Sequence, residues 1–194
     1  MDDDALQDDP FETYPSLSAV ARFSRLIPKT PWFRGLGDPL TADICEAARD
    51  YAHILGFPEI EPALITDWRD AAFTAESADW NSPAWEAEEQ LRAHLITRIH
   101  EDMDKHTIEL VQTYIGGIAS DAATEGIREA VMYLQIDDEA FAQAAVGAAV
   151  QACHLAALVL AAEGTADHPF SLKYQLFESG RWPIGIAGSS FNIF

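Results

Sequence analysis

Hydrophobic and polar positions follow helical spacing along most of this chain, and one stretch stands apart from the rest. Residues 139–164 carry no charge between Glu139 and Glu163, and Ala recurs on every side of the helix that they would form. A helix that is apolar all round is buried inside a protein, whereas a surface helix keeps a polar face. We therefore predict that 139–164 is the central helix of an all-α domain, with the other helices packed around it.

The rival interpretation of 139–164 is a membrane span. Spanning helices favour Leu, Ile, Val and Phe over about 20 residues, but Ala is the commonest residue here, and polar side chains lie in the middle. These side chains form one stripe at helical spacing: Glu139, Gln143, Gly147, Gln151 and His154. The stripe either reaches solvent through a gap between neighbouring helices or forms a buried seam that binds a ligand or fixes helix register, since buried polar groups need partners.

Helical periodicity also marks the segments on either side of the central helix. A capping residue followed by proline places helix starts at Asp38 and at Ser82. We predict helices over residues 17–27, 38–55, 62–77, 82–114, 121–135 and 139–164, and a short helical turn over 168–179. The pattern thus predicts a single bundle of about six or seven helices.

The segment 82–114 has the longest uninterrupted period. Its apolar face continues through His106 to Tyr114, and Gly116-Gly117 is expected to end or kink the helix. On the outer face, the spacing of four residues predicts an ion pair between Glu88 and Arg92.

Both ends of the chain depart from this helical pattern. Residues 1–13 are acidic with little to bury, which predicts a flexible tail before a single helical domain over 14–194. Residues 165–194 are a C-terminal docking extension, in which apolar residues alternate around Gly188-Ser189 and predict a small β-hairpin or a paired extended tail. A lone hairpin is marginal in water, so we expect Trp182 to be buried, either against its own helices or against a second chain.

The formal net charge of −20 restricts the partners of this 194-residue chain. An acidic surface repels nucleic-acid phosphates and anionic lipid headgroups, so we expect neither nucleic acid nor a membrane as a partner. Such a surface suits a soluble protein, or one whose partner is basic. The two cysteines, Cys45 and Cys153, lie in apolar helical patterns, and we recognise no secretory segment, so a cytoplasmic location with buried thiols is expected.

A third of the basic residues lie together in one short stretch beside the acidic N-terminus. They either neutralise an acidic helix surface in the same chain or bind an anion. These residues are Arg22, Arg25, Lys29 and Arg34.

The stretch His100–His106 is rich in potential metal ligands, but their spacing is wrong. Only residues three or four apart share a helix face, which separates the pair His100 and Asp104 from the pair Asp102 and His106. The metalloprotease motif needs two His four residues apart, and the spacing here is six. The sequence also lacks a Gly-x-Ser-x-Gly elbow, a P-loop and a dinucleotide fingerprint. We therefore expect no metal and no cofactor, and we assign no catalytic residue.

Five residues remain as candidates for a binding site. His106 interrupts an otherwise apolar stripe, and if it faced His154 and Gln151 across a helix interface the three would line a polar pocket. Arg181 and Trp182 belong to the residue types most enriched in binding hot spots. Trp182 is equally suited to anchoring the C-terminal extension to its own domain.

Three functions are compatible with these patterns, and no stretch is specific enough to indicate a family. The first is a non-enzymatic protein that acts through contacts with a protein partner or with a second copy of itself as a homodimer. The second is an acidic inhibitor of the immunity type that binds a basic partner, since opposite charge steers association. The third is a helical-bundle enzyme or small-ligand carrier with a polar pocket near His106 and His154.

Overall fold

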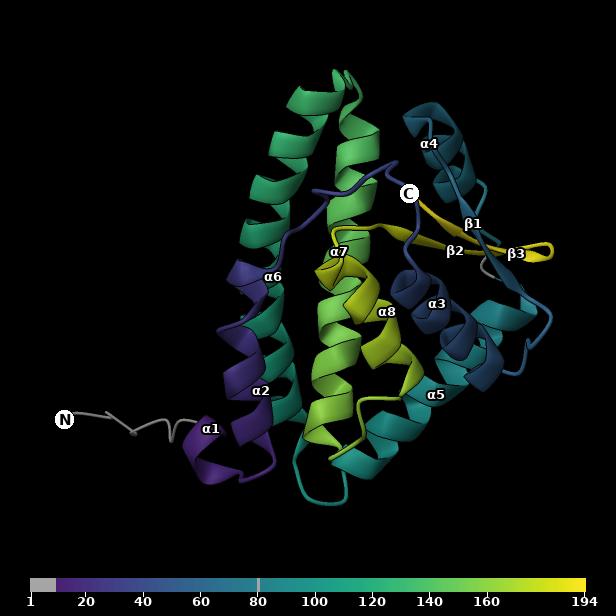
Figure 1. Ribbon diagram of the computed structural model, residues 1–194. Coiled ribbons are helices and arrows are strands. Elements are labelled where there is room, and N and C mark those ends of the chain that lie inside the picture. The colour runs from purple at the N-terminus through teal and green to yellow at the C-terminus, as the bar shows by residue number, and fades with distance from the viewer. Residues whose placement is uncertain (1–9, 80) are drawn as a thin grey trace.

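The computed structural model describes residues 10–79 and 81–194, and it is mostly helical with a small three-stranded sheet on one side (Figure 1). The helices are α1 (Pro10–Thr13), α2 (Leu17–Ser24), the 3₁₀ turn η1 (Ile27–Lys29), α3 (Ala42–Ile54), α4 (Trp68–Glu76), α5 (Pro83–Ile99), α6 (Lys105–Leu134), α7 (Glu139–Ala161) and α8 (Pro169–Glu178). The strands are β1 (Glu61–Leu64), β2 (Pro183–Ala187) and β3 (Ser190–Ile193), in the order β1-β3-β2. The prediction of a mainly helical domain with a small C-terminal hairpin is therefore confirmed in outline, and strand β1, which completes the sheet, was not predicted.

The Ala-rich helix α7 lies at the centre of the molecule. It runs antiparallel to α6 and also contacts α2, α5 and α8 (Figure 1). Of the sixteen residues from 144 to 159, nine are buried and three are exposed. The prediction of a central helix is confirmed, but burial on every side holds only for the C-terminal half, because α2, α5 and α8 cover that half.

By length and composition α7 is apolar enough to cross a membrane, with a mean hydropathy of 1.9 over its most apolar window. Half of that window is buried inside the fold. The core helix of a water-soluble protein has the same properties, and the packing of α7 among four other helices favours that interpretation.

The helix predicted over 82–114 is in fact two helices. α5 begins as predicted, because Ser82 Oγ accepts a hydrogen bond from the Trp85 N–H at 3.2 Å. α5 ends at Ile99, and α6 starts after Asp104, whose carboxylate accepts hydrogen bonds from the backbone N–H of Thr107 at 3.0 Å and from its hydroxyl at 2.7 Å. These two hydrogen bonds lower the pKa of Asp104 to about 2.

α6 continues through Gly116 and Gly117, where we predicted an end or a kink, and includes the helix predicted over 121–135. A Cβ at Gly116 would lie 2.7 Å from Nε2 of His154, so this glycine makes room for the imidazole. Because the chain turns between α5 and α6, the buried row of α6 does not continue the apolar face of α5. The buried row is Thr107, Val111, Ile115, Ala119, Ala123, Ile127 and Ala130.

Strand β1 replaces the start of the helix predicted over 62–77. Pro62 lies opposite Phe191 in the parallel pairing of β1 with β3, and α4 begins only at Trp68, after the capping residue Asp67. β1 is an edge strand, where a residue without a backbone N–H is tolerated. Similarly, the helix predicted from residue 38 begins at Ala42, with Thr41 as its capping residue.

The C-terminal hairpin forms as predicted and docks onto its own chain. Ile186 pairs with Phe191 across the turn, and Trp182 and Phe194 exchange two backbone hydrogen bonds of 2.7 and 2.9 Å. Trp182 is 2% exposed, and its ring packs edge-on against Phe141 of α7 at a centroid distance of 5.3 Å. The extension is thus part of the core of one protomer.

The N-terminal segment is described only from Pro10 onward. Residues 10–13, which we predicted to belong to a flexible tail, form the short helix α1. The ring of Phe11 packs edge-on against Tyr114 at 5.3 Å. The rest of the predicted acidic tail lies outside the described residues.

Candidate functional site

The polar stripe predicted along α7 reaches solvent. Glu139, Gln143, Gly147 and Gln151 are exposed, and His154 is half-buried. The amide of Gln143 donates a hydrogen bond to the Glu139 carboxylate one turn earlier, at 3.0 Å. Of the two interpretations, the one in which the stripe faces a gap between helices is correct, except at His154.

His154 joins α7 to α6 through reciprocal hydrogen bonds with Gln112. In the tautomer that carries the proton on Nε2, His154 donates to the Gln112 carbonyl at 3.0 Å, and the Gln112 amide donates to the His154 carbonyl at 3.3 Å. Its ring lies against Gly116, where a larger residue would collide with it. These contacts make His154 a residue that holds the two long helices together.

His106 does not join this arrangement. It is exposed in the first turn of α6, whereas Gln112 and Gly116, which contact His154, lie about 9 and 15 Å further along the helix at 1.5 Å per residue. The polar pocket predicted from His106, His154 and Gln151 is therefore not formed by these residues. The prediction failed because it extended the apolar face of 82–99 across the turn that separates α5 from α6.

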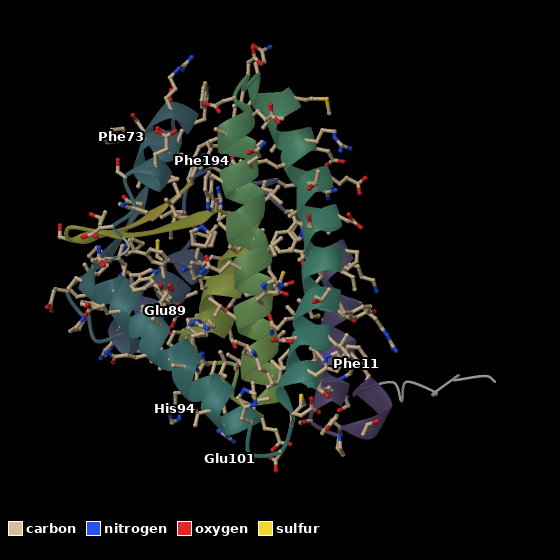
Figure 2. All side chains as sticks on the ribbon, turned by 180° about the vertical axis from the view of Figure 1, so that it is seen from behind. Phe11, Phe73, Glu89, His94, Glu101 and Phe194 are labelled. Atoms are coloured by element: carbon tan, nitrogen blue, oxygen red, sulfur yellow. The ribbon has the colours of Figure 1, made fainter. Side chains whose placement is uncertain are left out.

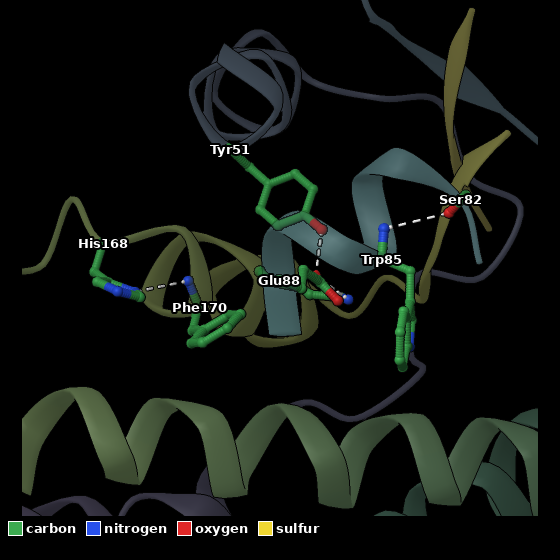
Figure 3. Close-up of polar contacts among 7 residues, drawn as sticks. Tyr51, Ser82, Trp85, Glu88, His168 and Phe170 are labelled. Carbon is green, nitrogen blue, oxygen red and sulfur yellow. Dashed lines mark hydrogen bonds and ion pairs between the residues drawn. The ribbon is translucent and has the colours of Figure 1, made fainter. Parts of the chain in front are cut away.

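We expect the free energy of unfolding to fall as the pH drops below 6.5, which is the ordinary pKa of a histidine side chain. Burial lowers the pKa of His154, and burial also lowers the pKa of His168, whose Nδ1 accepts a hydrogen bond from the Phe170 N–H at the start of α8 (Figure 3). Since folding lowers both pKa values, the unfolded state binds protons more readily. The stability that these two histidines contribute above pH 6.5 is lost as the pH falls through their lower pKa values in the folded state.

An NMR titration of the imidazole protons measures this directly. Both residues are expected to titrate below 6.5 in the folded protein, and urea unfolding should become easier over the same interval. A His154→Gln variant should show a flatter dependence of unfolding free energy on pH. Titration of either imidazole at or above 6.5 would contradict the expectation.

Arg181 and Trp182 are both occupied within the chain. Arg181 is 5% exposed, and its guanidinium donates to the carbonyls of Gly35, Asp38 and Pro39, the last two at 2.8 and 3.0 Å. These bonds fasten the loop before α3 to the start of the C-terminal hairpin. With Trp182 buried against α7, the pair anchors the extension instead of presenting a hot spot on the surface.

A groove of about 460 Å³ runs between the outer sides of α6 and α7. Figure 2, drawn from behind, shows these two helices side by side, and no other ribbon crosses in front of their upper halves. Glu139, at the start of α7, is the one charged residue in its lining. The other lining residues are Ser120, Thr124, Ile127, Ala142, Gln143, Val146, Gly147 and Val150.

A second groove, of about 480 Å³, lies on the other side of α6 and has the opposite character. Its α6 wall carries the carboxylates of Asp121, Glu125 and Glu129, one turn apart, and the loop around Trp32 forms the facing wall. Arg34 from that loop approaches Glu129 at 3.7 Å. At this one position the prediction is confirmed, because Arg34 of the basic stretch partly neutralises Glu129 on the acidic surface of α6.

A cluster of three polar side chains that we did not predict joins α3, α5 and α8. Glu88 accepts hydrogen bonds from the Tyr51 hydroxyl and from Lys173 Nζ, the latter at 2.7 Å (Figure 3). The side chains of Lys173 and Glu88 are only 16% and 14% exposed. Burial, and secondarily the Glu88 carboxylate, raise the pKa of Tyr51 well above its ordinary value.

The sequence pattern assigned Glu88 to the wrong partner. Arg92 does not pair with Glu88 as predicted but forms a bidentate pair with Glu89, the shortest contact being 2.6 Å. The buried position of Tyr51 on α3 was predictable from periodicity. Its convergence with residues 37 and 122 positions later along the chain was not.

The thiols and the potential metal ligands add no further site. Cys153 is buried, and burial raises its pKa to about 12, while Cys45 is only partly buried, which corrects the prediction that both are fully buried. Within residues 10–79 and 81–194, no three His, Cys, Asp or Glu side chains converge on a common point.

Comparison with protein-family models, curated proteins and solved structures finds no match to this chain.

Proposed function

We propose that this protein is a non-enzymatic cytoplasmic protein that acts through protein–protein contacts, and that the groove between α6 and α7 makes them. The observation that carries the proposal is the uncharged surface that α7 exposes in so acidic a chain. From Ala140 to Ala162 the helix has no charged residue, although 23% of the chain is charged. Its exposed residues in this stretch are Ala140, Gln143, Ala144, Gly147 and Gln151.

Protein interfaces are depleted of charge at their centre, and the α7 wall of the groove carries no charge beyond Glu139 at its end. The flanking carboxylates, Glu139 at the start of α7 and Glu163 after its end, would form the polar rim of such an interface. The buried Tyr51–Glu88–Lys173 cluster supports a structural interpretation of the remaining polar chemistry, because all three groups are partnered and largely removed from solvent.

Site-specific photo-crosslinking in cells tests this function. A photoreactive residue at Gln143, in the groove, is compared with the same residue at Gln90, which is exposed on α5. A discrete protein adduct is expected from position 143 and not from position 90. If position 143 gives no adduct, or if both positions give the same adducts, the groove is not a contact surface.

The acidic groove on the opposite side of α6 favours a second candidate, an inhibitor that binds a basic partner. Asp121 and Glu125 form no ion pair with the described residues 10–79 and 81–194, and their carboxylates lie one turn apart on an exposed wall, which suits the cationic side chains of such a partner. Association would then weaken steeply with salt, and the double variant Asp121→Asn/Glu125→Gln would slow it. Partner binding insensitive to both changes would remove this candidate.

A further inference from the structure

We infer that the occupant of the α6–α7 groove is a second copy of this chain, packed so that two helical hairpins form a four-helix interface. The inference rests on the proposed function and names its partner. It follows from the distribution of charge around α6, from two glycines, and from the size of the uncharged face.

The residues that α6 contributes to the two grooves differ in charge. Asp121, Glu125 and Glu129 line the acidic groove, whereas Ser120, Thr124 and Ile127 line the groove shared with α7. Together with the uncharged exposed row of α7, these residues form a neutral face between the two helices, which the exposed Arg128 borders one turn after Thr124. The carboxylates that line the acidic groove would repel any negatively charged protein.

This division selects the kind of partner. In a twofold interface each patch meets its own image, so a patch of one charge sign would repel itself. With a net charge of −20, two copies of this chain can approach closely only where both are locally neutral. A basic partner would instead be drawn to the carboxylates on the other side of α6, so the neutral face suits a second copy better than a basic protein.

Two glycines on this face have no sterically required role within the protomer. Within residues 10–79 and 81–194, a Cβ at Gly117 or at Gly147 would have no atom within 4 Å apart from adjacent residues and its own helix backbone. In contrast, a Cβ at Gly116 or at Gly126 would collide with His154 or Trp32. Glycine in a helix interior is less stable than alanine, so their presence calls for a reason. Gly117 lies three residues before Ser120 and so shares its face, and small residues let helices from two copies approach closely.

The size of the face fits a small, reversible dimer interface. The exposed row of α7 from Ala140 to Gln151 extends about 17 Å at 1.5 Å per residue, and two adjacent helices are about 20 Å wide. The face therefore offers on the order of 340 Å² per protomer. Two such faces bury about 700 Å², the size of a weak, transient interface, so we expect dimerisation to depend on concentration.

Sedimentation velocity of the full chain over a range of concentrations, combined with the crosslinking above, tests the inference. We expect a species of twice 21.3 kDa and a self-adduct from position 143. Thr124→Glu, which places a carboxylate in the groove of each copy, should weaken dimerisation at least tenfold. The control Thr97→Glu makes the same change at an exposed position of α5 and should leave it unchanged.

A second matched pair guards against misfolding. Gln143→Glu, in the groove, is nearly isosteric and should weaken the dimer, whereas Gln175→Glu on α8 should not. Circular dichroism verifies the fold of each variant. Gly147→Ala should raise the melting temperature of the dilute monomer and yet weaken the dimer, two opposite effects that a purely structural glycine would not give.

Three outcomes would overturn the inference. A monomer at every concentration whose position 143 crosslinks to a different protein rejects the second copy but leaves the proposed function standing. A dimer insensitive to Thr124→Glu and Gln143→Glu places the interface elsewhere. A monomer that binds neutral phosphatidylcholine vesicles through this face, with no protein adduct, rejects both the inference and the proposed function.

Discussion

Glu88→Ala is expected to lower the free energy of unfolding by about 3 kcal/mol. Removing one partner of a buried ion pair leaves the other charge uncompensated, and such changes cost about 3–5 kcal/mol when burial is complete. Here Lys173 keeps 16% of its side-chain exposure, so the lower end of that range applies. The change also removes the acceptor of the Tyr51 hydroxyl. Urea denaturation followed by circular dichroism measures the loss.

The neighbouring residue provides the control. Glu89 pairs with Arg92 at the surface of the same helix, with 33% and 41% side-chain exposure, and surface pairs contribute about 0–1 kcal/mol. Glu89→Ala should therefore cost much less than Glu88→Ala. The double variant Glu88→Leu/Lys173→Met should recover most of the stability, because it removes both buried charges together. Equal losses from the two single variants would show that the cluster does not stabilise the junction of α3, α5 and α8.

Phe191→Ala is expected to cost about 3–5 kcal/mol, the range for a fully buried phenylalanine. The side chain is 0% exposed and stacks on the ring of Tyr51 at a centroid distance of 4.8 Å. Phe191 belongs to β3, the central strand of the sheet. Its side chain is part of a hydrophobic cluster between the sheet, α3 and α8. Differential scanning calorimetry and urea denaturation should show the loss together.

Phe73 on α4 is the matched control, since it is 70% exposed and points outward (Figure 2). Phe73→Ala should change the free energy of unfolding by about 0.5 kcal/mol or less.

Deleting residues 190–194 should have the larger effect of preventing cooperative folding, because it removes the strand that pairs with both β1 and β2. A truncated protein with an unchanged melting temperature would show that the docked tail contributes nothing to the fold.

A local sequence signal located the start of α5. Ser82 accepts a hydrogen bond from the Trp85 N–H three residues later, and this contact needs no distant partner. The C-terminal hairpin was predictable for the same reason, since its strands are joined by a turn of two residues. The apolar composition of α7 also sufficed to place that helix at the centre of the molecule.

Distant contacts decided the features that the sequence left open. Pro62 belongs to a strand because β3, near the C-terminus, supplies its hydrogen-bonding partner. Position 116 inside α6 is a glycine because the ring of His154 occupies the space that a Cβ would fill. A residue pattern read along one segment contains no information about which side chain another segment brings to it.

The candidate site divides in the same way. The sequence by itself determined that α7 carries an uncharged row and a polar stripe, because both depend only on residue type and a period of 3.6. Tertiary structure decided that α6 lies beside that row with its carboxylates turned to the other groove, that His106 is far from His154, and that Glu88 meets Tyr51 and Lys173. The physical reason is that the free energy of these contacts depends on how helices far apart in the chain pack together.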